Sequence, residues 1–156
     1  MDSQSTEIIG RNLLVSQLVR DGLEVARPER DRGVDLVAYL DLDEAGGGFV
    51  AVPIQMKAAT KATFGIARKY EKFRGMLFAH LWRVHEPEHA CTYALTYIEA
   101  LQVAEQMGWT DTESWTLKDR YETTHPSRRL LDLLEPYLMR PGDWKGRVTG
   151  VAGSFS

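Results

Sequence analysis

The sequence predicts an α/β domain in which helices flank a central mixed sheet, with a helical extension at the C-terminus. Two observations predict it. A helical pattern near the N-terminus is followed by three strand patterns, a short helix and another strand, and three consecutive glycines separate the second and third strands. The chain has 156 residues, of which 44% are hydrophobic, enough to fill the core of one domain. We expect that domain over residues 1–140 and a glycine-rich tail over 141–156.

The first helix is expected from about residue 6 to residue 21, where apolar residues recur at helical spacing and Gly22 supplies a stop signal. On a helical wheel Glu7 shares a face with Leu14 and Leu18, the side that turns toward the core. A carboxylate on the core-facing side of a helix calls for a structural or functional explanation. Taken alone, it is explained by the favourable charge interaction in a first helical turn.

The strands that follow lead to a hairpin. A short strand is expected at 23–27, and a β-branched and aromatic run at 34–42 has strand character. The glycine-rich segment 43–48 is typical of a hairpin loop, so residues 49–59 form the partner strand. Pro53 removes one backbone donor there and indicates an edge position or a local bulge.

The second half of the chain continues with apolar strands and helices. We expect a short helix at 66–73, strands at 75–84 and 92–98, a helix at 99–107 and a last helix at 126–138. Four glycines stand in the last 16 residues, which predicts a tail that is loosely ordered unless it docks on a partner.

Four side chains are candidates for a metal-binding catalytic site. Strand alternation puts Gln55 and Lys57 on one face of their strand, and the glycine hairpin brings Asp35 toward them. Carboxylate and amide oxygens hold a hard divalent ion, and an ammonium group steadies or orients an attacking water. Glu7 adds a second carboxylate, directly or through water. This combination is suited to phosphodiester hydrolysis.

A helical Glu7, the turn Gly33–Asp35 and the strand end Ile54–Lys57 together resemble the PD-(D/E)XK nuclease superfamily, in particular its members with Q-x-K in place of E-x-K. The resemblance covers about residues 6–98 and implies the restriction-endonuclease-like αβββαβ core. It also implies an endonuclease that hydrolyses DNA with Mg²⁺ or Mn²⁺, often as a homodimer or higher homo-oligomer. The apolar strand around residues 77–82 is a candidate interface.

The resemblance further implies a role for each residue. Asp35 and Gln55 are metal ligands, the carbonyl of Met56 is another, Lys57 serves the nucleophilic water and Glu7 completes the site. Two departures stand out. Gln55 is neutral and attracts a divalent ion less than a carboxylate does. Val34 also stands where the family usually has proline. A nuclease fold with weak or lost catalysis, acting as a nucleic-acid- or protein-binding module, therefore remains the alternative.

Charge is unevenly distributed. The formal net charge is -3, which argues against a protein that coats nucleic acid non-specifically. Between residues 57 and 74, however, six basic residues face one acid, Glu71. A solvated helix face explains such a run by itself. Its place after the candidate strand makes four of its residues candidate phosphate contacts: Lys61, Arg68, Lys69 and Lys72.

Other readings have less support. Residues 85–89 spell H-E-x-x-H, but Pro87 disfavours the helix that this zinc motif requires, so the segment is expected to be a loop. His80 is expected to be a core histidine. The aromatic residues include a possible base-stacking platform, although core positions are the commoner outcome: Trp82, Trp109, Trp115, Trp144, Tyr93 and Tyr97. The single cysteine, Cys91, excludes an internal disulfide. Without a signal peptide or membrane span, we expect a cytoplasmic protein.

Overall fold

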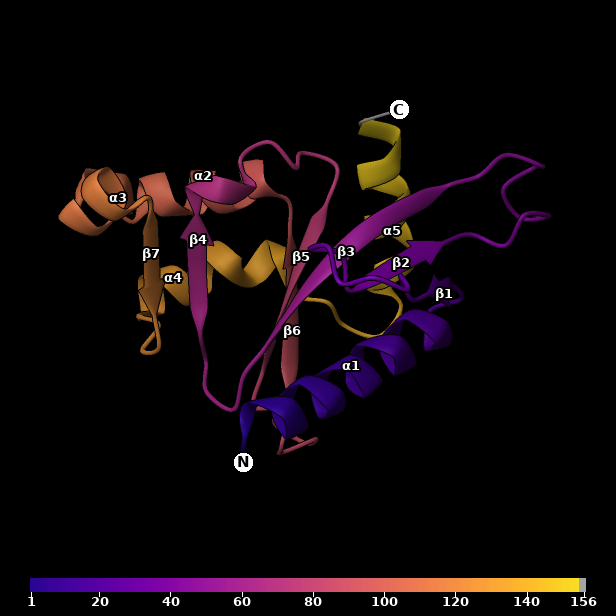
Figure 1. Cartoon of the computed structure of the whole chain (residues 1–156), viewed down its shortest axis with the longest axis horizontal. Coiled ribbons are helices and arrows are strands. Elements are labelled where there is room, and N and C mark those ends of the chain that lie inside the picture. The colour runs from indigo at the N-terminus through magenta and orange to yellow at the C-terminus, as the bar shows by residue number, and fades with distance from the viewer. Residues whose placement is uncertain (155–156) are drawn as a thin grey trace.

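A computed structural model describes residues 1–154 of the chain and centres on a five-stranded mixed sheet (Figure 1). The strands lie in the order β1-β2-β3-β5-β6, and only β3 and β5 pair in parallel. Their bounds are β1 Glu24–Ala26, β2 Leu36–Tyr39, β3 Ala51–Ala58, β5 Leu77–Trp82 and β6 Cys91–Leu95. The expected α/β architecture with a mixed sheet between helices is confirmed.

The hairpin of β2 and β3 has the predicted pairing, with Leu36 opposite Ile54 and Ala38 opposite Val52. These four side chains are fully buried in one core cluster. Because side chains alternate along a strand, Gln55 and Lys57 lie on the opposite face of β3. The register therefore decides which face carries the polar residues.

Two helices cover the first face of the sheet. Helix α1, Ser3–Arg20, packs Leu14 and Leu18 onto β3 and its neighbours, and α5, Asp143–Ser154, packs beside it. Gly10 is the point of closest approach, since a Cβ added there would lie 2.4 Å from the Cβ of Ala58. The absence of a side chain at Gly10 thus lets α1 lie directly against β3 and sets the position of Glu7 one turn earlier.

The C-terminal segment differs from expectation. Residues 143–154 form a helix whose Trp144, Val148 and Val151 are buried, and the Trp144 indole donates to the Gln17 side chain at 3.0 Å. The prediction of a loosely ordered tail is wrong for these residues, because burial of an apolar stripe outweighs the low helix propensity of glycine. Residues 155–156 lie outside the described residues.

The second face carries a smaller sheet and three helices (Figure 1). Strand β4, Phe64–Ala67, pairs antiparallel with β7, Arg120–Thr123. The helices are α2 Tyr97–Gln106, α3 Glu113–Lys118 and α4 Arg128–Leu134, with 3₁₀ turns η1 Arg68–Tyr70, η2 Trp109–Asp111 and η3 Glu135–Tyr137. The helix predicted at 126–138 corresponds to α4 and η3, but neither β4 nor β7 was predicted.

Three local expectations have clear outcomes. The crossover from β3 to β5 contains strand β4 and the 3₁₀ turn η1. The prediction of a short α-helix at 66–73 is therefore wrong, and only the 3₁₀ turn is helical there. Pro53 lies one residue before the β5 ladder begins at Ile54, so its missing donor costs no bond to β5. Strand β5 is buried along its whole length between β3 and β6, which excludes residues 77–82 as the expected subunit interface.

Other sequence readings concern single residues. All four tryptophans are buried, which fits core positions rather than a stacking platform. His80 is also buried, and residues 85–89 form turns between β5 and β6, as expected. Within residues 1–154, no helix combines the length and apolar character needed to cross a membrane.

We predict that Gly10→Ala destabilises the protein by about 1–3 kcal/mol, because the new methyl group collides with Ala58 and forces α1 away from β3. Gly150→Ala is the control, since it adds a methyl group to α5 with no atom within 4 Å and should stabilise by about 0.5–1 kcal/mol. Chemical denaturation of both variants measures the difference. Equal stabilisation in both would show that α1 does not approach β3 as described.

Candidate active site

Asp35 lies just before β2, and its carboxylate is held on β3. The backbone N–H of Met56 donates to Oδ2 of Asp35 at 2.7 Å, and the Asp35 N–H donates to the Ile54 carbonyl at 2.9 Å. In a continued ladder Met56 would pair with Val34. The Asp35 carboxylate instead takes the place of the missing backbone acceptor and is fixed between Gln55 and Lys57 along β3.

The electrostatic surroundings of Asp35 are acidic. Burial is the main cause that raises the pKa of this carboxyl group. The Met56 N–H opposes the rise, the carboxylates of Asp31 and Glu7 add to it, and Arg11 opposes it. A half-buried carboxylate among other carboxylates is a favourable place for a cation.

Gln55 has one satisfied end and one free end. Its Nε2 donates to the Tyr70 hydroxyl at 3.1 Å, whereas Oε1 is buried without a hydrogen-bond partner in residues 1–154. An unsatisfied buried acceptor costs about 1–3 kcal/mol, so such atoms are rare away from functional sites. Such an oxygen can coordinate a hard cation.

Lys57 lies on the same face of β3 as Gln55 and is also next to Tyr70. The Lys57 Nζ lies 5.0 Å from the centroid of the Tyr70 ring, and Lys69 Nζ lies at the same distance. Burial raises the pKa of the Tyr70 hydroxyl, but the Gln55 hydrogen bond and the two ammonium charges outweigh it and hold that pKa below its usual value. Tyr70 thus positions both motif residues of β3.

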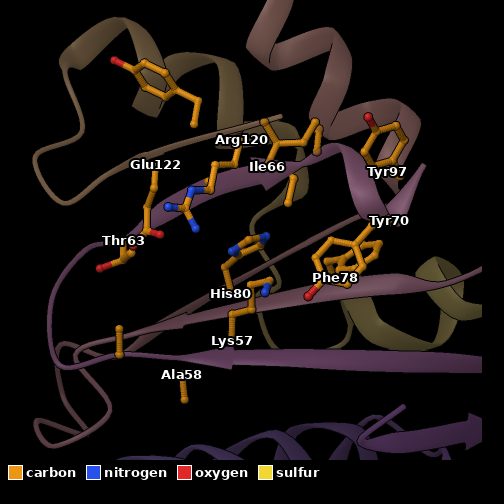
Figure 2. Close-up of a pocket in the computed structure, with 15 residues that line it drawn as sticks. Lys57, Ala58, Thr63, Ile66, Tyr70, Phe78, His80, Tyr97, Arg120 and Glu122 are labelled. Carbon is orange, nitrogen blue, oxygen red and sulfur yellow. The ribbon is translucent and has the colours of Figure 1, made fainter. Parts of the chain in front are cut away.

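His80 is the neighbour of Lys57 on β5, in direct register across the parallel ladder. Burial, with the Lys57 charge as a second cause, lowers the pKa of His80 to about 3. The imidazole is therefore neutral at physiological pH and adds no positive charge beside Lys57. Figure 2 shows Lys57, His80 and Tyr70 facing one cavity, which Phe78 also lines.

Glu7 is at the edge of this group. Its side chain is 56% exposed and forms an ion pair with Arg11 at 2.8 Å, one helical turn later. Its charge acts on Asp35, but its carboxylate makes no hydrogen bond to Asp35, Gln55 or Lys57 within residues 1–154. A direct ligand role would require Glu7 to leave Arg11, whereas a role through water would not.

The donor set fits a divalent cation of the magnesium kind. Asp35 offers a carboxylate, Gln55 an unsatisfied carbonyl oxygen, and the Met56 carbonyl belongs to the same stretch of β3. No group of three or more His, Cys, Asp and Glu side chains in residues 1–154 is arranged to hold a metal. Such a cation would keep several waters, as Mg²⁺ usually does in proteins.

The four candidate phosphate contacts differ in their surroundings. Arg68 is engaged, since its guanidinium pairs with Asp119 at 3.1 Å and lies 4.9 Å from the Trp115 ring. Lys69 and Lys72 lie over aromatic rings and are exposed. Lys61 is exposed in the turn before β4. Their contact with nucleic acid stays a prediction, and Arg68 would have to exchange a partner.

Sequence reasoning missed Tyr70, Asp31 and the contributions of β7. Asp31 stands four residues before Asp35, and that spacing of two acids was a usable signal. Tyr70 had no local signal, because its contact with Gln55 exists only after the crossover folds back over β3. Arg120 and Glu122, which line the cavity, come from a strand that was not predicted.

The fold is nuclease-like. Among solved structures the chain is similar to a bacterial homing endonuclease, I-Ssp6803I, with a TM-score of 0.51 and 13% sequence identity, covering 98% of this chain and 96% of that chain. No family model matches the sequence, and no curated protein does either. At this identity the likeness establishes the nuclease-like fold and leaves the role of each residue open.

We predict that Asp35→Asn raises the melting temperature of the metal-free protein at neutral pH. Since burial raises its pKa above that of the unfolded chain, the ionised carboxylate opposes folding. The associated stability is present at low pH, where the group is protonated, and is lost as pH rises through the raised pKa. Asparagine keeps an acceptor for Met56 and removes the charge.

Thermal melts of wild type and Asp35→Asn at pH 4 and pH 7.5, with EDTA, measure this effect, and the gap should widen at the higher pH. Asp132→Asn, at an exposed position of α4, is the control. A variant that melts below wild type at pH 7.5 would contradict the electrostatic description of the site.

Proposed function

We propose that this protein is a divalent-metal-dependent endonuclease that hydrolyses DNA phosphodiester bonds, a divergent PD-(D/E)XK member with a Q-x-K motif. One observation carries the proposal. The Asp35 carboxylate is anchored on the Met56 N–H, between Gln55, whose buried Oε1 lacks a partner in residues 1–154, and Lys57 on the same face of β3. A turn residue, a polar strand position and a charge at a strand end explain Asp35, Gln55 and Lys57 one at a time. They do not explain why the three residues lie together.

In the proposed reaction Asp35 and Gln55 hold Mg²⁺ or Mn²⁺, with the Met56 carbonyl as a further oxygen and Glu7 supporting from α1. When bound, the cation would neutralise charge on the scissile phosphate. The Lys57 ammonium orients the attacking water and offsets negative charge as the phosphorane-like transition state forms. Tyr70 keeps Lys57 and Gln55 in place through its ring and its hydroxyl.

The choice of DNA as substrate rests on fold likeness and charge. The similar solved structure is of a homing endonuclease. The basic residues Lys61, Lys69 and Lys72 follow the candidate strand and suit a phosphate backbone. Fold alone does not fix activity, so the substrate belongs to the proposal. A homodimer, which would act on both strands, is proposed on the family resemblance, without the β5 interface.

A second candidate function is a binding module without useful catalysis. The observations that favour it are the neutral Gln55 and the ion pair that holds Glu7 on Arg11. Within residues 1–154, Asp35 is the one carboxylate whose side chain is hydrogen-bonded to β3, so affinity for a divalent ion would be modest. Cleavage assays separate the two.

We predict that the wild-type protein nicks or linearises supercoiled plasmid, or cuts a branched DNA, with Mg²⁺ or Mn²⁺. Asp35→Ala and Lys57→Ala should each lower the rate at least about 100-fold, because one removes the ionic ligand and the other the group that orients water. Gel electrophoresis over time measures the rates.

Asp132→Ala and Lys118→Ala, at exposed positions of α4 and α3, are matched controls and should cleave like wild type, with folding checked by circular dichroism. Cleavage that survives the site substitutions would point to a contaminant or another site. No cleavage of any substrate would favour the binding module.

We predict that Gln55→Glu tightens Mg²⁺ binding roughly tenfold, because a second carboxylate joins Asp35. The metal-free variant should also melt at a lower temperature, since the two carboxylates repel each other. Isothermal titration calorimetry and thermal melts with EDTA test both effects. Gln102→Glu, on the exposed face of α2, is the control, and unchanged Mg²⁺ affinity in Gln55→Glu would argue against a cation at this oxygen.

A further inference from the structure

A cavity with a volume of about 460 Å³ opens next to Lys57, and Figure 2 shows the side chains that line it. Its floor is formed by Lys57, Phe78 and His80 of β3 and β5, and its walls by β4, β7 and the first turn of α2. Asp35 and Gln55 do not line it. The cavity is thus a separate subsite that meets the candidate cleavage site at Lys57, and its size suits a ligand such as a single nucleotide.

Besides the Lys57 ammonium, the floor and inner wall of the cavity present neutral aromatic rings. Tyr70 and Phe78 lie in contact with ring centroids 5.1 Å apart, and Tyr97 lines the wall from α2. His80 is neutral, because burial and the Lys57 charge lower its pKa to about 3. Flat, neutral rings of this kind accept the face of a planar heterocycle.

The rim carries a donor and an acceptor that have no partner in the fold. Arg120 and Glu122 stand two residues apart on β7, so both side chains project to the same side. Neither forms a side-chain hydrogen bond or ion pair with any of residues 1–154. A base edge presents donors and acceptors side by side, and a guanidinium next to a carboxylate matches such an edge.

Gly65 holds β7 in this position. A Cβ on Gly65 would lie 2.8 Å from the Tyr121 carbonyl and 3.1 Å from the Glu122 Cβ. Glycine therefore permits the close pairing of β4 with β7 that brings Arg120 and Glu122 to the rim. The β7 strand would otherwise lie farther from the floor at His80.

We propose that this cavity receives one unstacked nucleobase of a DNA strand whose adjoining phosphate lies at Lys57. The substrate is then DNA that contains an unpaired nucleotide, at a branch, a bulge or a single-stranded stretch, and this inference rests on the proposed function. Lys57, Arg120 and Glu122 together carry a net positive charge, which favours a ligand with a phosphate group. The aromatic lining favours a ligand with a planar ring. A free nucleotide shares that chemistry and is distinguished below.

The experiment measures binding in EDTA by fluorescence anisotropy, so that cleavage does not interfere. Labelled DNAs of equal length are a paired duplex, the same duplex with one bulged nucleotide and a single strand. Wild-type protein should bind the two DNAs with unpaired nucleotides at least about tenfold more tightly than the paired duplex. Arg120→Met and Glu122→Gln should each reduce that preference severalfold, with little change for the paired duplex.

Arg128→Met and Glu113→Gln, at exposed positions of α4 and α3, are the matched controls and should keep the preference. Equal affinity for paired and unpaired DNA in wild type, or a preference that both rim substitutions leave intact, would overturn the inference. Competition by deoxynucleoside monophosphates at concentrations as low as those of the oligonucleotides would overturn it in favour of a free-nucleotide site.

Failure of this inference and failure of the proposed function are separable. Metal-dependent cleavage lost in Asp35→Ala, without a preference for unpaired nucleotides, removes the nucleobase site and keeps the nuclease. A preference that depends on Arg120, in a protein that cleaves nothing, keeps the nucleobase site and removes the nuclease.

Discussion

The hydrogen bond from the Met56 N–H to the Asp35 carboxylate is the contact on which the candidate site depends. It joins the chain entering β2 to the middle of the motif on β3, where the ladder would otherwise have continued through Val34. The faces of β3 are fixed by the buried pairs of the hairpin. A one-residue slip would turn Gln55 and Lys57 into the core beneath α1, so the apolar register protects the polar site.

Tyr70 also holds the motif residues of β3 in place. Its hydroxyl accepts from Gln55, its ring lies near two ammonium groups, and it contacts Phe78 on β5. The crossover that carries Tyr70 is held in turn by Arg68, whose backbone N–H donates to the Asp119 carbonyl at 2.8 Å. Residues about fifty positions later in the chain thereby support the geometry of the motif, which links the small β4–β7 sheet to the site.

The sequence was most informative where signals are local. The helix before Gly22, the glycine loop and the alternation along β3 rest on neighbouring residues, and the structure agrees with them. The β4–β7 pairing could not be predicted, because FGIA and RYET are four residues each and gain strand character only from each other. Helix α5 was missed because its glycines lower helix propensity, whereas burial of Trp144 against the sheet stabilises it.

Electrostatics offers a reason for a neutral residue at position 55. Burial is the main cause that raises the pKa of Asp35, and the negative charges of Asp31 and Glu7 raise it further. A third carboxylate beside it would raise that pKa further and destabilise the fold whenever no cation is bound. Glutamine supplies an oxygen without that repulsion, and Tyr70 fixes its orientation by accepting from the amide nitrogen. The site then gives up part of its attraction for a cation and keeps a stable metal-free state.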